Sequence, residues 1–302
     1  MQVIKLKNKI NLHFIFVLIA AVLWGTAGVF VKSAVSLGIK EMQIVFFRAL
    51  ISALVYAALI LFKNKSLFKI ALKDLWLFIS TGFFSIVLFN FSYYKTMSLT
   101  TLSVAAVLLY TAPFFVFIMS IPLFKEKVTF AKIFALVSAF LGCAFVSGVF
   151  WGEQSISLTA LIFGLLTGFG YSLYTIFSQI LINKKYHSLT ITFYAFLSAA
   201  VGTLPFISIT KTFSAVIVAP KILWVMLLMA LFNTVIPYIL YTKGLMGVST
   251  TAAPIIATVE PVVATVISIM YGEAFKLWHL IGIALVLLSV VILNLGGRKN
   301  EN

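Results

Sequence analysis

Two charged residues lie in stretches of sequence that are otherwise apolar, and they are the first candidates for chemistry. Glu260 lies inside 244–272 and is followed directly by Pro261, and Arg48 lies inside 42–62. A carboxylate in such surroundings can bind a cationic amine or exchange a proton, and a guanidinium can bind a carboxylate. Two structural alternatives stay open: the residues form a fixed ion pair, or Arg48 extends its charge to the nearest water.

Polar and aromatic side chains recur in the middle of several apolar stretches. Asn90 and Tyr94 are four residues apart and Tyr171 and Tyr174 three apart, so each pair shares one face of a helix. A buried asparagine needs a partner or a wet cavity, and a tyrosine offers an apolar ring with a polar tip. The alternative is hydrogen bonding between helices. The predicted cavity-lining residues are Trp24, Asn90, Tyr94, Tyr110, Tyr171, Tyr174, Asn233, Tyr238 and Glu260.

Two lysines end apolar stretches at matching places, Lys95 after 75–94 and Lys243 after 222–242. A lysine at such a place extends its ammonium to the membrane surface, or it pairs with an acid and gates a path between helices. We therefore treat Arg48, Lys95 and Lys243 as candidates for an ion pair or a gate.

Enzyme signatures are absent from the sequence. It has no Gly-rich phosphate loop, no Gly-x-Ser-x-Gly turn and no pair of acids inside the apolar stretches. One cysteine, Cys143, and three scattered histidines exclude a multi-cysteine metal site and a His-based one. We predict no enzyme activity, no metal and no cofactor.

The composition places these residues in a membrane protein. The 302-residue chain is 63% hydrophobic with 10% charged residues and a mean hydropathy of +1.16, whereas a soluble domain carries about 25% charged residues. A membrane-spanning helix needs about 20 mostly apolar residues, and the backbone in hydrocarbon must be helical. Ten stretches are long enough: 10–31, 42–62, 75–94, 96–124, 133–152, 154–183, 186–210, 222–242, 244–272 and 277–297.

The basic residues behind the net charge of +15 are unequally distributed between the two sides of these stretches. With the N-terminus inside, 15 Lys and Arg residues fall on the inner side and 5 on the outer side, while Lys32 and Arg48 lie within stretches. This asymmetry is the positive-inside pattern, so we predict a multi-pass protein with both termini cytoplasmic and no nucleic-acid partner. The N-terminal apolar run is longer than the core of a cleavable signal peptide.

An internal repeat relates the two halves of the chain. Shifting the sequence by 148 residues places Tyr93 on Tyr241, Lys95 on Lys243 and Pro113 on Pro261. Each half holds five stretches, and since five is odd, the second half enters the membrane from the opposite side. We therefore predict an all-α membrane protein of ten transmembrane helices in two inverted five-helix repeats, 1–152 and 153–302. Inverted repeats are typical of transporters with a midplane substrate site.

Short motifs are distributed over the two repeats. They are Trp24–Gly25, Arg48, Pro113 with Glu126, Glu260–Pro261 and Gly272–Glu273. In this set the sequence resembles the EamA family of the drug/metabolite transporter superfamily, over nearly its whole length. One departure is that Ala112 stands before Pro113 where Glu260 stands before Pro261, so the carboxylate is present once.

The resemblance implies a secondary transporter of the bacterial inner (plasma) membrane, a permease that exports amino acids or related metabolites by alternating access around a central cavity. Its partners would be a small-molecule substrate and the lipid bilayer, with protons as a candidate coupling ion and a monomer or homodimer as the assembly. Two alternatives stay open: a drug efflux permease, and an integral membrane protein of another class, such as an enzyme or a receptor.

Overall fold

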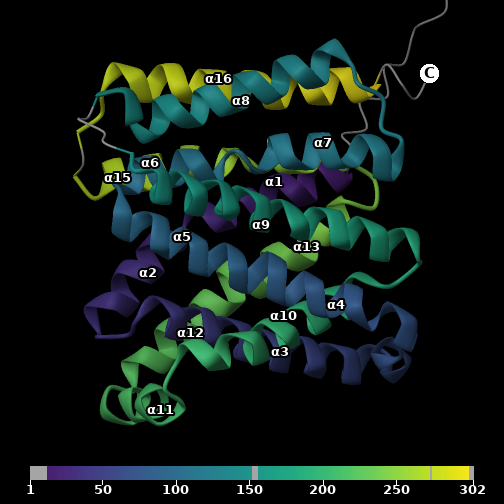
Figure 1. Ribbon diagram of the computed structural model, residues 1–302, viewed down its shortest axis with the longest axis vertical. Helices are drawn as coiled ribbons and strands as arrows, with labels where there is room; N and C mark the ends of the chain where they lie inside the picture. The colour runs from purple at the N-terminus through teal and green to yellow at the C-terminus, as the bar shows by residue number, and fades with distance from the viewer. Residues whose placement is uncertain (1–11, 152–155, 273, 299–302) are drawn as a thin grey trace, which may run out of the picture.

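Ten helices of the described residues are long and apolar enough to cross a membrane, which confirms the predicted number. The structure is a computed structural model that describes residues 12–151, 156–272 and 274–298; Glu273 of the sequence motifs lies outside these residues. Figure 1 shows the spans running side by side. We number them 1–10 in chain order: Leu12–Ser36, Glu41–Lys63, Leu72–Leu99, Leu102–Phe124, Phe130–Ser147, Leu158–Asn183, Ser188–Phe206, Lys221–Gly244, Ala252–Met270 and Leu277–Asn294.

The first five spans contain nine α- and π-helical elements. Spans 1, 3 and 4 are each divided into shorter elements, whereas spans 2 and 5 are single helices. The elements are α1 (Leu12–Gly25), α2 (Ala27–Ser36), α3 (Glu41–Lys63), α4 (Leu75–Gly82), η3 (Phe83–Val87), α5 (Leu88–Leu99), α6 (Leu102–Leu109), α7 (Ala112–Phe124) and α8 (Phe130–Ser147).

The second five spans repeat this plan, except that span 6 is a single helix where span 1 is divided. A short apolar helix, α11 (Ile209–Val218), lies between spans 7 and 8 and is too short to cross a membrane. The spanning elements are α9 (Leu158–Asn183), α10 (Ser188–Thr203), α12 (Lys221–Ala230), η6 (Leu231–Val235), α13 (Ile236–Gly244), α14 (Ala252–Ala257), α15 (Val259–Met270) and α16 (Leu277–Arg298). Short 3-10 turns complete the chain: η1 (Lys65–Phe68), η2 (Leu72–Asp74), η4 (Val149–Trp151) and η5 (Leu204–Phe206).

Packing between spans follows the repeat. Span 1 packs on span 8 through α1 and α13, and span 6 packs on span 3 through α9 and α5. In the same way α1 contacts α14 and α15 of span 9, and α9 contacts α6 and α7 of span 4. Spans 5 and 10 pair as α8 and α16 at one end of the array, and spans 2 and 7 pair as α3 and α10 toward the other (Figure 1). The fold is therefore two inverted five-helix repeats that interlock.

Two breaks in the spanning helices coincide when the repeats are superposed by 148 residues. Span 4 breaks at Tyr110 and Thr111, and span 9 breaks at Thr258. The hydroxyls of Thr111 and Thr258 each donate to the carbonyl three residues earlier, Leu108 O and Ile255 O, at 2.6 Å. Proline follows each break and cannot donate the next helical hydrogen bond. Broken spans at midplane are the usual places for transporter binding sites.

Spans 3 and 8 each contain a π-helical segment, η3 and η6, again 148 residues apart. A π turn weakens the local helix ladder, and such segments are frequent at functional sites. In span 8 the freed carbonyls of Thr234 and Val235 accept hydrogen bonds from the Tyr56 hydroxyl at 3.3 and 3.1 Å. Span 2 therefore holds the irregular part of span 8 in place.

Candidate functional site

An aromatic cavity lies between spans 1, 3, 6 and 8. It has a volume of ≈ 10 Å³, which is about the space of one water molecule. The cavity is therefore nearly closed in this structure, and a ligand would enter it only after the spans move apart. Its lining residues are Trp24, Ser85, Phe89, Tyr171, Tyr174, Thr175, Tyr238 and Tyr241.

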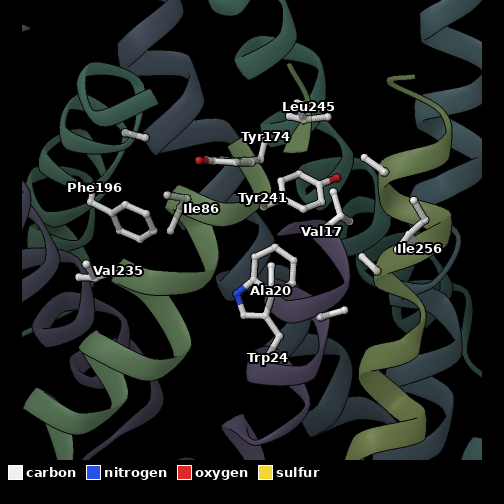
Figure 2. Close-up of a cluster of buried hydrophobic side chains, with 14 of the residues drawn as sticks. Val17, Ala20, Trp24, Ile86, Tyr174, Phe196, Val235, Tyr241, Leu245 and Ile256 are labelled. Carbon is white, nitrogen blue, oxygen red and sulfur yellow. The ribbon is translucent and has the colours of Figure 1, made fainter. Parts of the chain in front are cut away.

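Trp24 is the center of the aromatic packing. Its ring lies 5.2 Å from the Tyr238 ring and 5.3 Å from the Tyr241 ring, both tilted or edge-on. Tyr174 meets Tyr238 edge-on at 4.8 Å. Figure 2 shows Trp24 on the α1 ribbon facing Tyr241, with Tyr174 beyond it. Edge-on and tilted geometry is favourable for aromatic pairs, so the rings form a packed wall.

The tyrosine hydroxyls fall into two groups. The Tyr174 hydroxyl bonds to the Thr242 hydroxyl at 2.9 Å, and the Tyr241 hydroxyl bonds to the Thr175 hydroxyl at 2.8 Å. Both hydrogen bonds connect span 6 to span 8. The half-buried Tyr94, Tyr110, Tyr171 and Tyr238 have no hydrogen-bond partner among the described residues. Their hydroxyls are free to bond to a ligand or to water.

Glu260 lies in the first turn of α15, directly after the break in span 9. Its side chain is half-buried and has no hydrogen bond or ion pair among the described residues. The end of α1 packs closely here: a Cβ on Gly25 would lie 2.7 Å from the Glu260 carbonyl oxygen. The positive end of the α15 dipole favours a negative charge at this position.

The charge of Glu260 acts on tyrosines from four different spans. The Glu260 carboxylate interacts electrostatically with Tyr93, Tyr110, Tyr171 and Tyr238. Three of these are free hydroxyls of the predicted site. The structure therefore brings Tyr110, Tyr171, Tyr238 and Glu260 to one region of the molecule.

Arg48 lies across this region, in the middle of α3. Its Nε–H donates to Thr234 Oγ1 of η6 at 3.1 Å, which orients the guanidinium toward span 8. The charge of Arg48 acts on Tyr94, Tyr238 and Glu260. No ion pair joins Arg48 to Glu260 within the described parts of the chain. The site therefore holds two opposite charges that are near one another and unbridged, and both act on Tyr238.

The two predicted asparagines are placed differently. Asn90 is buried, and its amide donates to Ile86 O of its own span at 2.7 Å. Asn233 is buried in η6, and its amide donates to Leu23 O at 2.6 Å and to Thr26 Oγ1 at 2.9 Å. It thereby satisfies the end of α1, where span 1 breaks. Neither side chain lines the aromatic cavity.

The two predicted lysines lie at opposite faces of the bundle. Lys95 is exposed near the end of span 3. Lys243 is half-buried at the end of span 8 and lines a groove with Lys63 and His187. Neither ammonium forms an ion pair with an acid of the described residues.

Four cavity residues were not among the predicted site residues: Ser85, Phe89, Thr175 and Tyr241. Thr175 follows Tyr174 and could have been found from helical spacing. Ser85 lies in η3 and Phe89 directly after it, and a π turn rotates the following helix by about 100° relative to regular spacing. No sequence signal marks that rotation.

Beyond the cavity, Glu126 joins the two repeats at a loop end. Its carboxylate accepts from Lys132 Nζ and from Thr251 Oγ1, both at 2.7 Å. Burial raises the pKa of Glu126, but these hydrogen bonds outweigh burial and hold the pKa below its ordinary value. This carboxylate is structural, because its oxygens are occupied by the protein.

Comparisons with known proteins agree with this arrangement. The model of the EamA-like transporter family matches residues 11–148 and again residues 158–295. An uncharacterized transporter of Archaeoglobus fulgidus is 28% identical over 281 residues, covering 91% of this chain and 94% of its own length. The uncharacterized inner membrane transporter YicL of Salmonella typhimurium is 24% identical, covering 94% of this chain and 95% of its own.

A solved crystal structure shares the fold. It has a TM-score of 0.79 at 15% identity and covers 96% of this chain and 99% of its own chain. The family match spans both repeats, and the curated relatives are named as transporters rather than enzymes. The protein is a multi-pass membrane transporter for a small molecule, and the chain belongs to the EamA-like transporter family.

Proposed function

We propose that the protein is a secondary transporter for amino acids or closely related zwitterionic metabolites. The observation that carries this proposal is the pair of unbridged opposite charges, Arg48 and Glu260, with Tyr238 under the influence of both. A zwitterion presents a carboxylate to the guanidinium and an ammonium to Glu260. The free tyrosine hydroxyls then supply neutral hydrogen bonds between the two charges.

Coupling and mechanism follow from the same residues. A carboxylate without a permanent partner can carry a proton when the site is empty and release it when the substrate ammonium arrives, so protons are the proposed coupling ion. Spans 1, 3, 4, 8 and 9 are irregular near their middles and supply points where the repeats bend during alternating access.

A drug efflux permease is the second candidate, and the aromatic wall around Trp24 favours it. A flat cationic drug would use the rings and Glu260 but would have no need of a guanidinium. Arg48 therefore separates the two: Arg48→Gln abolishes transport of a zwitterion and leaves transport of a cationic drug largely unchanged.

The experiment is untargeted metabolite profiling of cells that overexpress the protein. Comparison strains carry Glu260→Gln, Arg48→Gln and, as a matched control, Glu41→Gln, which removes an exposed acid at the start of span 2. The expected result is that the wild type and Glu41→Gln deplete the same amino acids from the cytoplasm and accumulate them outside. Identical profiles for Glu260→Gln and wild type would contradict the proposal.

Export and location rest on the family resemblance and on the distribution of lysines. We propose residence in the bacterial inner (plasma) membrane with both termini cytoplasmic. Reporters fused after Glu153 and after Lys184 test this, with expected locations outside and inside the cell. The reverse pattern would overturn the orientation and, with it, the assignment of export.

A further inference from the structure

A second cavity lies at the end of spans 2 and 8. It is a groove of ≈ 350 Å³ lined by Leu59, Phe62, Lys63, His187, Leu189, Ile239 and Lys243. Lys63 is the last residue of α3 and Lys243 the next to last of α13, while His187 precedes α10. The three basic groups therefore lie at the same face of the bundle, at the depth of the membrane surface.

The basic groups lack a negative partner. Lys63 Nζ lies 3.1 Å from His187 Nε2, and no ion pair to an acid involves Lys63 or Lys243 within the described residues. Asp74, a nearby acid on the following segment, is occupied by Lys184 and by the hydroxyl of Tyr186. Burial and the positive charges of Lys63 and Lys243 lower the pKa of His187, so every charge acting on this ring is positive.

Hydrogen bonding at His187 points to a missing acceptor. The ring nitrogen Nδ1 accepts the backbone N–H of Leu189 at 3.0 Å, which caps the start of α10. A neutral imidazole has one acceptor and one donor, so the proton then lies on Nε2. This N–H faces the Lys63 ammonium, which can only donate. Two donors converge with no acceptor between them, and an anionic oxygen in the groove would accept from both.

The walls of the groove identify the kind of anion. Leu59 and Ile239 lie one helical turn below Lys63 and Lys243, on the same helix faces and deeper in the membrane. Phe62 is 91% exposed, so its ring faces the surrounding bilayer rather than the protein. The groove is thus basic at the membrane surface and apolar below it. A small soluble anion would use only the upper part.

We propose that this groove binds the phosphate headgroup of an anionic phospholipid, with an acyl chain lying along Leu59, Phe62 and Ile239. The phosphate oxygens accept from Lys63, Lys243 and His187 Nε2. Basic pockets between spanning helices are known to hold anionic headgroups. A lipid here would join spans 2, 7 and 8, which come from both repeats.

The test measures lipid binding to the purified full-length protein by native mass spectrometry and by thermal stability in a neutral detergent. The probes are phosphatidylglycerol, phosphatidylcholine, glycerol phosphate and inorganic phosphate. The variants are Lys63→Gln with Lys243→Gln, and His187→Asn, which retains a capping side chain. Lys211→Gln is the matched control, since Lys211 is the repeat counterpart of Lys63 at the other face of the bundle.

Each lysine near an anionic surface contributes enough to change affinity about fivefold, so the double variant is expected to bind phosphatidylglycerol about thirtyfold more weakly. His187→Asn should weaken binding several-fold, and Lys211→Gln should not. Unchanged binding in the double variant, or an equal loss in Lys211→Gln, would overturn the site. Stabilisation by inorganic or glycerol phosphate equal to that by phosphatidylglycerol would overturn the assignment to a lipid.

Discussion

Spans 4 and 9 hold the same place in the two repeats and break at the same point, yet they carry different chemistry. Where span 9 has Glu260 before Pro261, span 4 has the buried Ala112 before Pro113. Spans 2 and 7 differ in the opposite sense: Arg48 of span 2 corresponds to the buried Ala195 and Phe196 of span 7. Each repeat therefore supplies one charge, and its counterpart in the other repeat is apolar.

This difference distinguishes structural features that both repeats share from charged residues that a ligand would contact. The breaks of spans 4 and 9, the π segments of spans 3 and 8 and the close helix contacts occur in both repeats, which gives each repeat points where it can bend. Each charge occurs once, as the proposal of a zwitterionic substrate, with one carboxylate and one ammonium, requires. Because Arg48 and Glu260 belong to different repeats, the distance between the two charges would change if the repeats moved relative to each other.

The largest effect is expected on transport when the carboxylate is moved from span 9 to span 4. Loss of a charged hydrogen bond costs about 1.5–3 kcal/mol, so Glu260→Gln should slow transport about ten- to a hundredfold. Adding Ala112→Glu should not restore it, because the new carboxylate lies on the wrong side of the pseudo-two-fold. Transport is measured in proteoliposomes with the amino acid identified by profiling.

A stability measurement on the same proteins separates a ligand site from a fixed ion pair. Because Glu260 has no ion pair among the described residues, Glu260→Gln should melt close to wild type. A permanent buried pair would instead lose about 3–5 kcal/mol when one partner is removed, and Arg48→Met would then recover it. A large loss rescued by that second change would establish a structural role.

The next prediction sharpens the comparison at the contact between spans 1 and 9. A Cβ on Gly25 would lie 2.6 Å from Val263 Cβ, whereas a Cβ on Gly28 meets nothing within 4 Å. Gly25→Ala should therefore destabilise the protein by about 1–3 kcal/mol through overpacking, and Gly28→Ala should be close to neutral. Thermal unfolding in detergent compares them, and equal stability of the two variants would contradict the close contact.

The sequence predicted the spans and the repeats because hydropathy and charge are properties of whole segments. It also pointed to Glu260 and to Tyr171, Tyr174 and Tyr238, since polar groups inside apolar stretches are conspicuous. The structure then separates these tyrosines by their hydrogen bonds: Tyr174 bonds to Thr242, while Tyr171 and Tyr238 have no hydrogen-bond partner in the part of the chain that the structure describes. Spacing along one helix carries no information about a partner on another helix.

The sequence could not predict which faces of spans 3 and 8 are turned toward the aromatic cavity. Regular helical spacing grouped Asn90 with Tyr94, which both lie in α5, but it could not predict how η3 rotates α5 as a whole relative to the neighbouring spans. Ser85 and Phe89 consequently line the aromatic cavity and Asn90 bonds within its own span. A π turn depends on contacts with neighbouring spans. For η6 these contacts are the hydrogen bonds from Tyr56 and Arg48 of span 2.

The two π segments offer a smaller contrast. In η6, Asn233 bonds to Leu23 O and Thr26 Oγ1 of span 1, while the corresponding Ser85 of η3 donates to Thr81 O of its own span. Asn233→Leu should cost about 1–3 kcal/mol, because a buried carbonyl loses a partner, and Ser85→Ala about 0.5–1 kcal/mol. Thermal unfolding of both variants tests this, and a larger loss for Ser85→Ala would reverse the expected order.

The last prediction concerns the effect of pH at Glu126, whose bonds to Lys132 and Thr251 connect the end of span 4 to the start of span 9. Since the folded-state pKa lies below its ordinary value, the stabilisation is fully present above about pH 4.5 and is lost as the pH falls through the lower folded pKa. Glu126→Gln should therefore lower the melting temperature at pH 7 by an amount equivalent to about 1–2 kcal/mol, with a difference that shrinks toward pH 3. Melting curves of both proteins from pH 3 to pH 7 measure it. A difference that stays constant across this range would show that the charge of Glu126 contributes nothing, and that the link between spans 4 and 9 depends on packing alone.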